Sequence, residues 1–117
     1  MQRIAFMMLC IIPMIAYADN FSFLNYSAIS YFQGQDKTFM MSNAIKALNQ
    51  YPDGKKASWN NQSTGSFGYA IPSKTTTANG LTCRNLTIFN SAKHVTGEAT
   101  YRLCKVSALW KFVPKGS

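Results

Sequence analysis

An apolar leader at the N-terminus limits how much of the chain is left to fold. The segment from Ile4 to Ile15 is almost wholly apolar, follows the positive charge of Arg3, and precedes Ala16-Tyr17-Ala18, a small-x-small cleavage site. This layout predicts a secretory signal peptide over residues 1–18, too short and wrongly flanked for a spanning helix. Its removal would leave about a hundred residues, enough for one domain with a single modest core and without a transmembrane segment.

Cysteine usage agrees with export. Cys10 lies inside the leader and leaves with it, so the mature chain keeps Cys83 and Cys104. A disulfide between them would persist in an oxidising compartment. It would close a loop of about twenty residues and stabilise the fold by roughly 3 kcal/mol. A redox pair is the alternative, but the Cys-x-x-Cys spacing typical of such pairs is missing.

One segment has the pattern of an amphipathic helix. Its apolar residues recur at the spacing of one buried stripe, namely Met40, Met41, Ala44, Ile45, Leu48 and Tyr51. Asp36 is a good N-cap residue for this helix. Pro52-Asp53-Gly54 ends it, because proline cannot continue the hydrogen-bond ladder.

From residue 55 onward apolar and polar residues alternate, which is the pattern of strands. Strands are predicted at 57–60, 66–71, 81–89, 96–105 and 108–113, with loops at 73–80 and 90–95. In the third strand the alternation puts Arg84, Leu86 and Ile88 on one side and Cys83, Thr87 and Phe89 on the other. The expected class is α+β: one amphipathic helix packed on a four- to five-stranded antiparallel β-meander with one disulfide.

The first two predicted strands form a structural hairpin. Its markers are Trp59, Gly65 and Gly68, with Gly65 expected at positive φ in a polar turn. Trp59 and Trp110 both lie on predicted strands, so we interpret them as core or helix-facing residues rather than as platforms for a ligand.

The ends of the mature chain differ from its centre. Residues 19–35 mix aromatic and polar side chains without a clean period, and we interpret them as an N-terminal arm that packs on the domain or on a partner. The domain itself is expected over residues 36–113. Residues 114–117 should fray.

The charge balance favours anionic partners. Without Arg3, eleven basic residues face four acidic ones, a net charge of about +7. The basic residues are dispersed, and Lys55-Lys56 is their one adjacent pair. Arg84, Arg102 and Lys105 are the exception, because they could lie on one sheet face as a small basic strip, which is a candidate site for an anionic ligand. Cross-strand packing on a solvated face is the alternative for this strip.

Few residues of the chain are suited to catalysis. His94 is the one histidine, and the four acidic residues of the mature chain are scattered. A metal site would need several His, Cys or acidic ligands, and the bridge would consume both cysteines. We therefore predict no catalytic residues, no metal site and no cofactor.

Several of these pieces occur in an order that resembles a known family. They are Ala47-Leu48 at the helix end, the hairpin from Trp59-Asn60 to Thr64-Gly65, Cys83-Arg84, Cys104, and a closing Leu109-Trp110. The set resembles the C-terminal domain of the rickettsial-type 17-kDa surface antigens of proteobacterial outer envelopes, over about residues 36–113. The resemblance implies a small, disulfide-bridged α+β domain in the envelope of a Gram-negative bacterium.

The chain also departs from that family. Its members often carry a lipidation cysteine and a glycine zipper, but Met7-Met8-Leu9 before Cys10 lacks the small residue that lipidation needs, and there is no glycine repeat. Ala108-Leu109 replaces the usual glycine before the closing tryptophan. Membrane anchoring and surface display are therefore not implied.

The expected function is that of a non-enzymatic exported envelope protein, periplasmic or associated with the outer membrane or cell surface. It would act as an interaction module for another envelope protein, with the arm available for docking. One alternative is a secreted inhibitor of a hydrolase such as lysozyme, although such inhibitors tend to offer acidic loops. Another is a binder of an anionic glycan or nucleic acid. The sequence does not set the oligomeric state.

Overall fold

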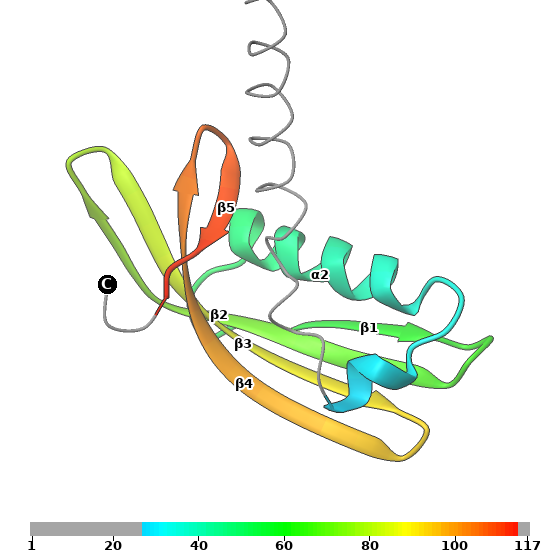
Figure 1. Cartoon of the computed structure of the whole chain (residues 1–117). Helices are drawn as coiled ribbons and strands as arrows, with labels where there is room; N and C mark the ends of the chain where they lie inside the picture. The colour runs from blue at the N-terminus through cyan, green and yellow to red at the C-terminus, as the bar shows by residue number, and fades with distance from the viewer. Residues whose placement is uncertain (1–26, 115–117) are drawn as a thin grey trace, which may run out of the picture.

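The computed structural model describes residues 27–114, which form one sheet and two helices (Figure 1). The elements are η2 (Ser27–Tyr31, a 3-10 helix), α2 (Asp36–Gln50), β1 (Ala57–Asn61), β2 (Ser66–Ala78), β3 (Leu81–Ala92), β4 (Val95–Val106) and β5 (Leu109–Phe112). The strands pair antiparallel in the order β1-β2-β3-β4-β5. The predicted α+β meander with one helix and five strands is thus confirmed.

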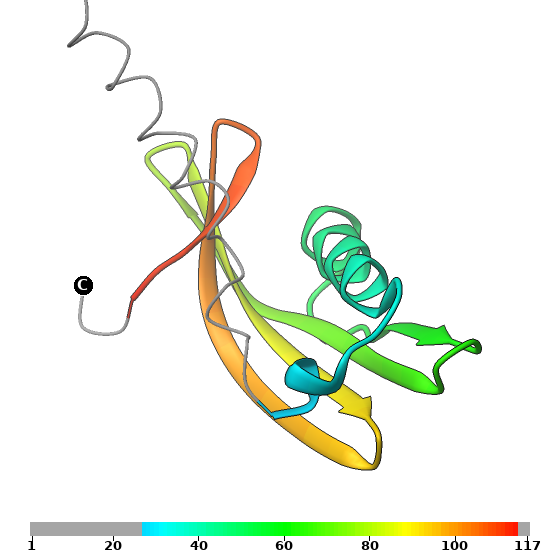
Figure 2. The ribbon, with the colours of Figure 1, turned by 45° about the vertical axis from the view of Figure 1, so that its right-hand side comes forward.

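Both helices lie on the same face of a curled sheet, which we call the inner face (Figure 2). Helix α2 packs on β1, β2 and β3, while η2 packs on β3 and β4. The other face is the outer face, and no helix among residues 27–114 lies on it.

The core lies between α2 and the inner face. Its buried members are Met40, Ala44, Ala47, Leu48, Ala57, Ala70, Leu86, Ile88, Leu103 and Trp110. The helical stripe differs from the predicted one at Ile45, which is 40% exposed, while Ala47 is fully buried. At 100° per residue, Ile45 lies well to the side of the line through Met40, Ala44 and Ala47.

Helix α2 begins differently from the prediction. Gln35 occupies the N-cap position, and Asp36 is the first helical residue. The buried Asp36 carboxylate accepts hydrogen bonds from the Gln33 N–H, the Asn61 amide and the Thr64 hydroxyl. Burial raises the pKa of Asp36, but the hydrogen bonds outweigh it and leave the pKa below its ordinary value. Asp36 thereby ties the start of the helix to the β1–β2 turn.

The strands are longer than predicted, and the loops expected at 73–80 and 90–95 are mostly strand. Strand β2 continues past Pro72 through an irregularity between Ser73 and Thr76. The Pro72 carbonyl accepts a hydrogen bond from the Gly54 N–H on the β1 side of β2. The N–H that proline lacks would point to the same side, and β1 does not extend far enough to pair with it. Proline is therefore tolerated at this position of the strand. The threonines that follow favour extended backbone.

The hairpin glycines serve two purposes. Gly65 has φ +82° in the β1–β2 turn, as predicted. Gly68 lies opposite Trp59, and a Cβ there would overlap the Phe89 carbonyl oxygen and lie 2.8 Å from the Trp59 Nε1. The Trp59 ring packs against the core and meets Phe32 edge-on at 5.6 Å between ring centroids. Gly68 is therefore required for close packing beneath Trp59.

Replacing Gly68 by alanine is expected to destabilise the domain by about 1–3 kcal/mol, because the neighbouring backbone has to move. Urea unfolding followed by tryptophan fluorescence measures the change. Gly80→Ala is not a neutral comparison, since Gly80 has φ +76°, so Ser58→Ala on the exposed outer face serves as the control. An unchanged midpoint for Gly68→Ala would contradict the tight packing.

The segment predicted as an N-terminal arm is described only from residue 27. This part packs on the domain: Ala28 is buried, and Phe32 contacts Trp59. The predicted signal peptide, residues 19–26 of the arm and residues 115–117 of the tail lie outside the described residues. Neither helix within residues 27–114 is long and apolar enough to cross a membrane.

Candidate functional site

The predicted disulfide is present. Cys83 and Cys104 are direct partners in the β3–β4 register and are bonded on the outer face, with a sequence separation of 21. The bridge joins β3 and β4 near the C-terminal end of β4, where β4 also pairs with β5.

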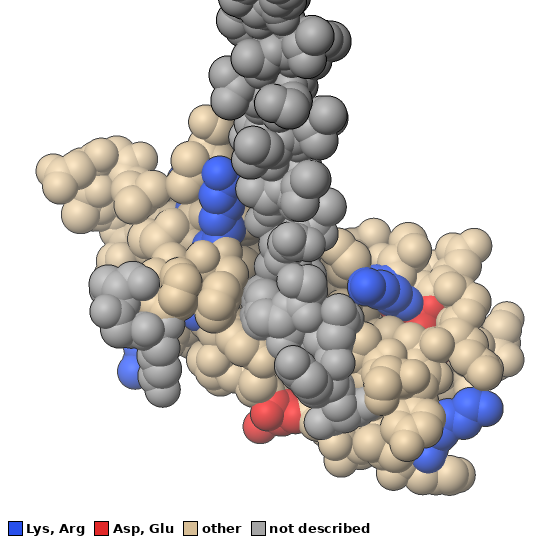
Figure 3. All heavy atoms as spheres, viewed as in Figure 1, with Lys and Arg blue, Asp and Glu red and all other residues tan. Residues whose placement is uncertain are grey.

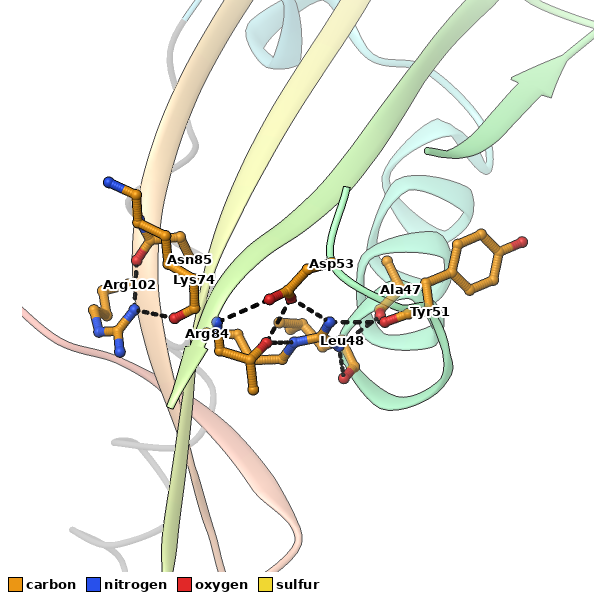
Figure 4. Close-up of polar contacts among 9 residues, drawn as sticks. Ala47, Leu48, Tyr51, Asp53, Lys74, Arg84, Asn85 and Arg102 are labelled. Carbon is orange, nitrogen blue, oxygen red and sulfur yellow. Dashed lines mark hydrogen bonds and ion pairs between the residues drawn. The ribbon is translucent and has the colours of Figure 1, made fainter. Parts of the chain in front are cut away.

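Arg84 is a structural residue on the inner face. Its Nε donates to the Thr75 hydroxyl, and its two terminal nitrogens donate to the carbonyls of Ala47, Leu48 and Tyr51 and to the Asp53 carboxylate (Figure 4). A guanidinium has five N–H donors, and these partners use all of them. Arg84 caps the carbonyls at the end of α2, where a cation is also favoured by the helix dipole.

Arg84, Arg102 and Lys105 do not all lie on one sheet face, so the predicted strip of three basic residues does not form. Arg102 pairs with Asn85 in the register and lies on the outer face, where it donates to the Lys74 carbonyl, the Asn85 amide oxygen and the Thr76 hydroxyl. Lys105 shares the inner face with Arg84, and its ammonium lies 5.9 Å from the Trp110 ring centroid. Successive strand residues point to opposite faces, so Arg102 is separated from Arg84 and Lys105, which line one hollow on the inner face.

The Asp53 carboxylate forms an ion pair with Arg84. The carboxylate also accepts hydrogen bonds from the Thr75 hydroxyl, at 2.6 Å, and from the Thr75 N–H. The Thr75 hydroxyl, Arg84 and the Thr75 N–H together lower the pKa of Asp53 to about 2. Thr75 reaches Asp53 because it lies in the irregular stretch of β2.

Stability is expected to fall in acid through Asp53. A carboxyl with a depressed folded pKa stabilises the fold above its unfolded pKa of 3.8 and loses this contribution as the pH falls toward about 2. Urea midpoints at pH 6, 3.5 and 2 measure the loss. Asp53→Asn should lose less stability than wild type across this window, and an equal loss in both proteins would contradict the assignment.

The outer face carries a cluster of aromatic side chains, Phe67, Tyr69 and Phe89, which we call the aromatic cluster. Tyr69 stacks on Phe89 at 5.0 Å between ring centroids, and Phe67 lies 6.2 Å from Phe89. The Lys56 ammonium lies 4.2 Å from the Tyr69 ring centroid. Phe67 remains 46% exposed. Antiparallel sheets usually place polar residues on a face that meets only water, so this cluster is a candidate binding surface.

Glu98 anchors the far side of the aromatic cluster. The Tyr69 hydroxyl donates to its carboxylate at 2.7 Å, and this hydrogen bond raises the pKa of Tyr69. Glu98 lies opposite Phe89 in the β3–β4 register. The cluster is therefore held in place by side chains of β2, β3 and β4.

An open hollow of about 450 Å³ lies beside the aromatic cluster, along β1. One side is the wall made by Phe67 and Tyr69. The other is a low row of Ser58 and Asn60, which pair with Tyr69 and Phe67 respectively. Lys56 lines one end. We call Lys56, Ser58, Asn60 and this aromatic wall the β1 ledge.

The surface charge of the described residues is strongly positive. Asp36 is buried, Asp53 is bound to Arg84, and Glu98 is bound to Tyr69. Lysines, in contrast, are exposed over most elements, at Lys37, Lys46, Lys55, Lys56, Lys74, Lys93 and Lys105. On the face shown in Figure 3 the basic groups stand apart from one another. The positive charge is thus spread out, as the sequence suggested.

His94 lies at the β3–β4 turn, exposed and at φ +68°. In the described part of the chain no three His, Cys, Asp or Glu side chains gather as a metal site would require.

The residues of the β1 ledge were not predicted as a site. The signal for them was available: alternation had placed Phe89 on the side away from Leu86 and Ile88, and Phe67 and Tyr69 share the same period. Alternation alone does not tell which of the two faces the helices cover, so it does not show that these rings lie outside the core.

No family model, curated protein or solved structure matches this chain.

Proposed function

We propose that this protein is a non-enzymatic, exported binding module of a bacterial envelope, periplasmic or surface-associated. The leader-like residues 1–18 and the disulfide between Cys83 and Cys104 support export to an oxidising compartment. The resemblance of residues 36–113 to the envelope surface antigens supports the same location.

The observation that carries the binding role is the aromatic cluster on a sheet face that no described helix covers. Burying an exposed ring such as Phe67 is favourable at about 25 cal/mol per Å² of apolar area. A rigid sheet also presents these rings with little ordering to lose on binding. We therefore place the contact with an envelope component on the outer face rather than on α2.

Two measurements on cells test this proposal. Mass spectrometry should find a chain that begins at Asp19, with Cys83 and Cys104 oxidised. A photo-crosslinker at Asn60, on the outer face, should capture an envelope component, and one at Lys46, on the exposed side of α2, should not. An uncleaved leader with free thiols would contradict export, and equal capture from both positions would contradict the outer face as the binding surface.

A further inference from the structure

We propose that the β1 ledge binds a carbohydrate chain that carries anionic groups, such as carboxylates. This inference rests on the proposed function, because it assigns a ligand class to the same outer face. It also narrows that function, since it gives each residue of the ledge a separate task.

The wall of the ledge suits a sugar ring. The C–H groups on the apolar face of a sugar pack well on the negative face of an aromatic ring. Phe67 is the ring that offers such a face, because it is 46% exposed, whereas Tyr69 is covered by Phe89 on one side and approached by Lys56. The ledge therefore provides one principal stacking position, at Phe67.

The low row of the ledge supplies hydrogen bonds. Within the described residues, the side chains of Ser58 and Asn60 make no hydrogen bond to another protein group, and both line the hollow. A hydroxyl and an amide both donate and accept, as the hydroxyls of a sugar require. A purely apolar ligand would leave these groups unpaired, which costs free energy.

Lys56 sets the charge of the ligand. Its ammonium contacts the Tyr69 ring and has no carboxylate within ion-pair distance among residues 27–114. Glu98, an acidic residue on β4, is bound to the Tyr69 hydroxyl. An anionic substituent of the ligand would therefore meet Lys56.

The same observations argue against nucleic acid at this site. A nucleic acid strand carries one charge per nucleotide and is bound by several cations along its backbone, with bases stacked on exposed ring faces. The ledge has one lysine, and one of its two rings is already covered. Sparse charge and one stacking position fit an acidic polysaccharide better.

Binding to immobilised polysaccharides tests the inference, using the purified oxidised chain. We expect binding to polygalacturonate or alginate, which carry carboxylates, and none to neutral dextran. Lys56→Met should weaken binding by about tenfold, and Lys46→Met, which removes the same charge from α2, by less than about twofold. Phe67→Ala should also weaken it by about tenfold, whereas Ile45→Ala, at a similarly exposed apolar side chain of α2, should not.

Circular dichroism and thiol titration establish that each variant is folded and oxidised. If Phe67→Ala does not fold, Phe67→Leu replaces it in the binding measurement. The inference is overturned by absence of binding to both acidic polysaccharides, by equal loss in Lys56→Met and Lys46→Met, or by equally tight, equally Lys56-dependent binding to single-stranded oligothymidylate. Its failure is separate from that of the proposed function. A processed chain that crosslinks to an envelope protein from Asn60 but binds no acidic polysaccharide would overturn only the inference.

Discussion

Replacing Arg84 by methionine is expected to destabilise the domain by about 3–5 kcal/mol, the largest effect of any single substitution considered for this chain. Methionine fills similar space but donates no hydrogen bond. The carbonyls of Ala47, Leu48 and Tyr51 would lose their donor at the end of α2, and Asp53 would lose its cation. Urea unfolding at neutral pH, followed by circular dichroism, measures the change.

Two comparisons separate hydrogen bonding from charge. Arg84→Lys keeps the charge but not the planar fork, so it should recover only part of the lost stability. Arg102→Met makes the same substitution on the adjacent strand, where the guanidinium lies on the outer face and is partly exposed, and should cost about 1 kcal/mol or less. If the two methionine variants were equally stable, Arg84 would not be the residue that caps α2.

Removing the disulfide, as Cys83→Ser with Cys104→Ser, is expected to cost about 3 kcal/mol. The physical reason is that the bridge restricts the conformations of the unfolded chain. Small domains have unfolding free energies of about 5–15 kcal/mol, so this loss would be a large part of the total. Urea midpoints of the oxidised protein, the reduced protein and the double variant measure it.

The double variant also provides the control. Reductant should lower the midpoint of the wild-type protein and leave that of the double variant unchanged. A wild-type midpoint that does not respond to complete reduction would show that the β3–β4 pairing is maintained by hydrogen bonds and packing alone. That result would also remove the main reason for this chain to fold in an oxidising compartment.

The elements of the fold could be predicted because each carries a local period. The 3.6-residue spacing of Met40, Ala44 and Leu48 predicted α2. The two-residue alternation of β3 placed Leu86 and Cys83 on opposite faces of the sheet. Cys83 and Cys104 were predicted to pair because they are the two cysteines outside the leader, and the β3–β4 register makes them direct partners. The ends of the strands were predicted less well, because Pro72 and the polar residues after it have the composition of a loop.

The role of Arg84 could not be predicted in this way. Alternation put its side chain on the same side as Leu86 and Ile88, but its carbonyl partners lie 33 to 37 residues earlier in the chain. Nothing in a local pattern says that a helix will end above that point of β3. From the sequence, Arg84 is a candidate residue for binding an anionic ligand, whereas in the structure it caps the carbonyls at the end of α2.

The outer face of the sheet shows the same division. The sequence by itself determined which side chains alternate together, and so which rings share a face, because the period of a strand is set by its backbone. Only the tertiary structure decided which face the helices cover. That choice depends on packing between segments far apart in the chain, and it left Phe67, Tyr69 and Phe89 outside the core.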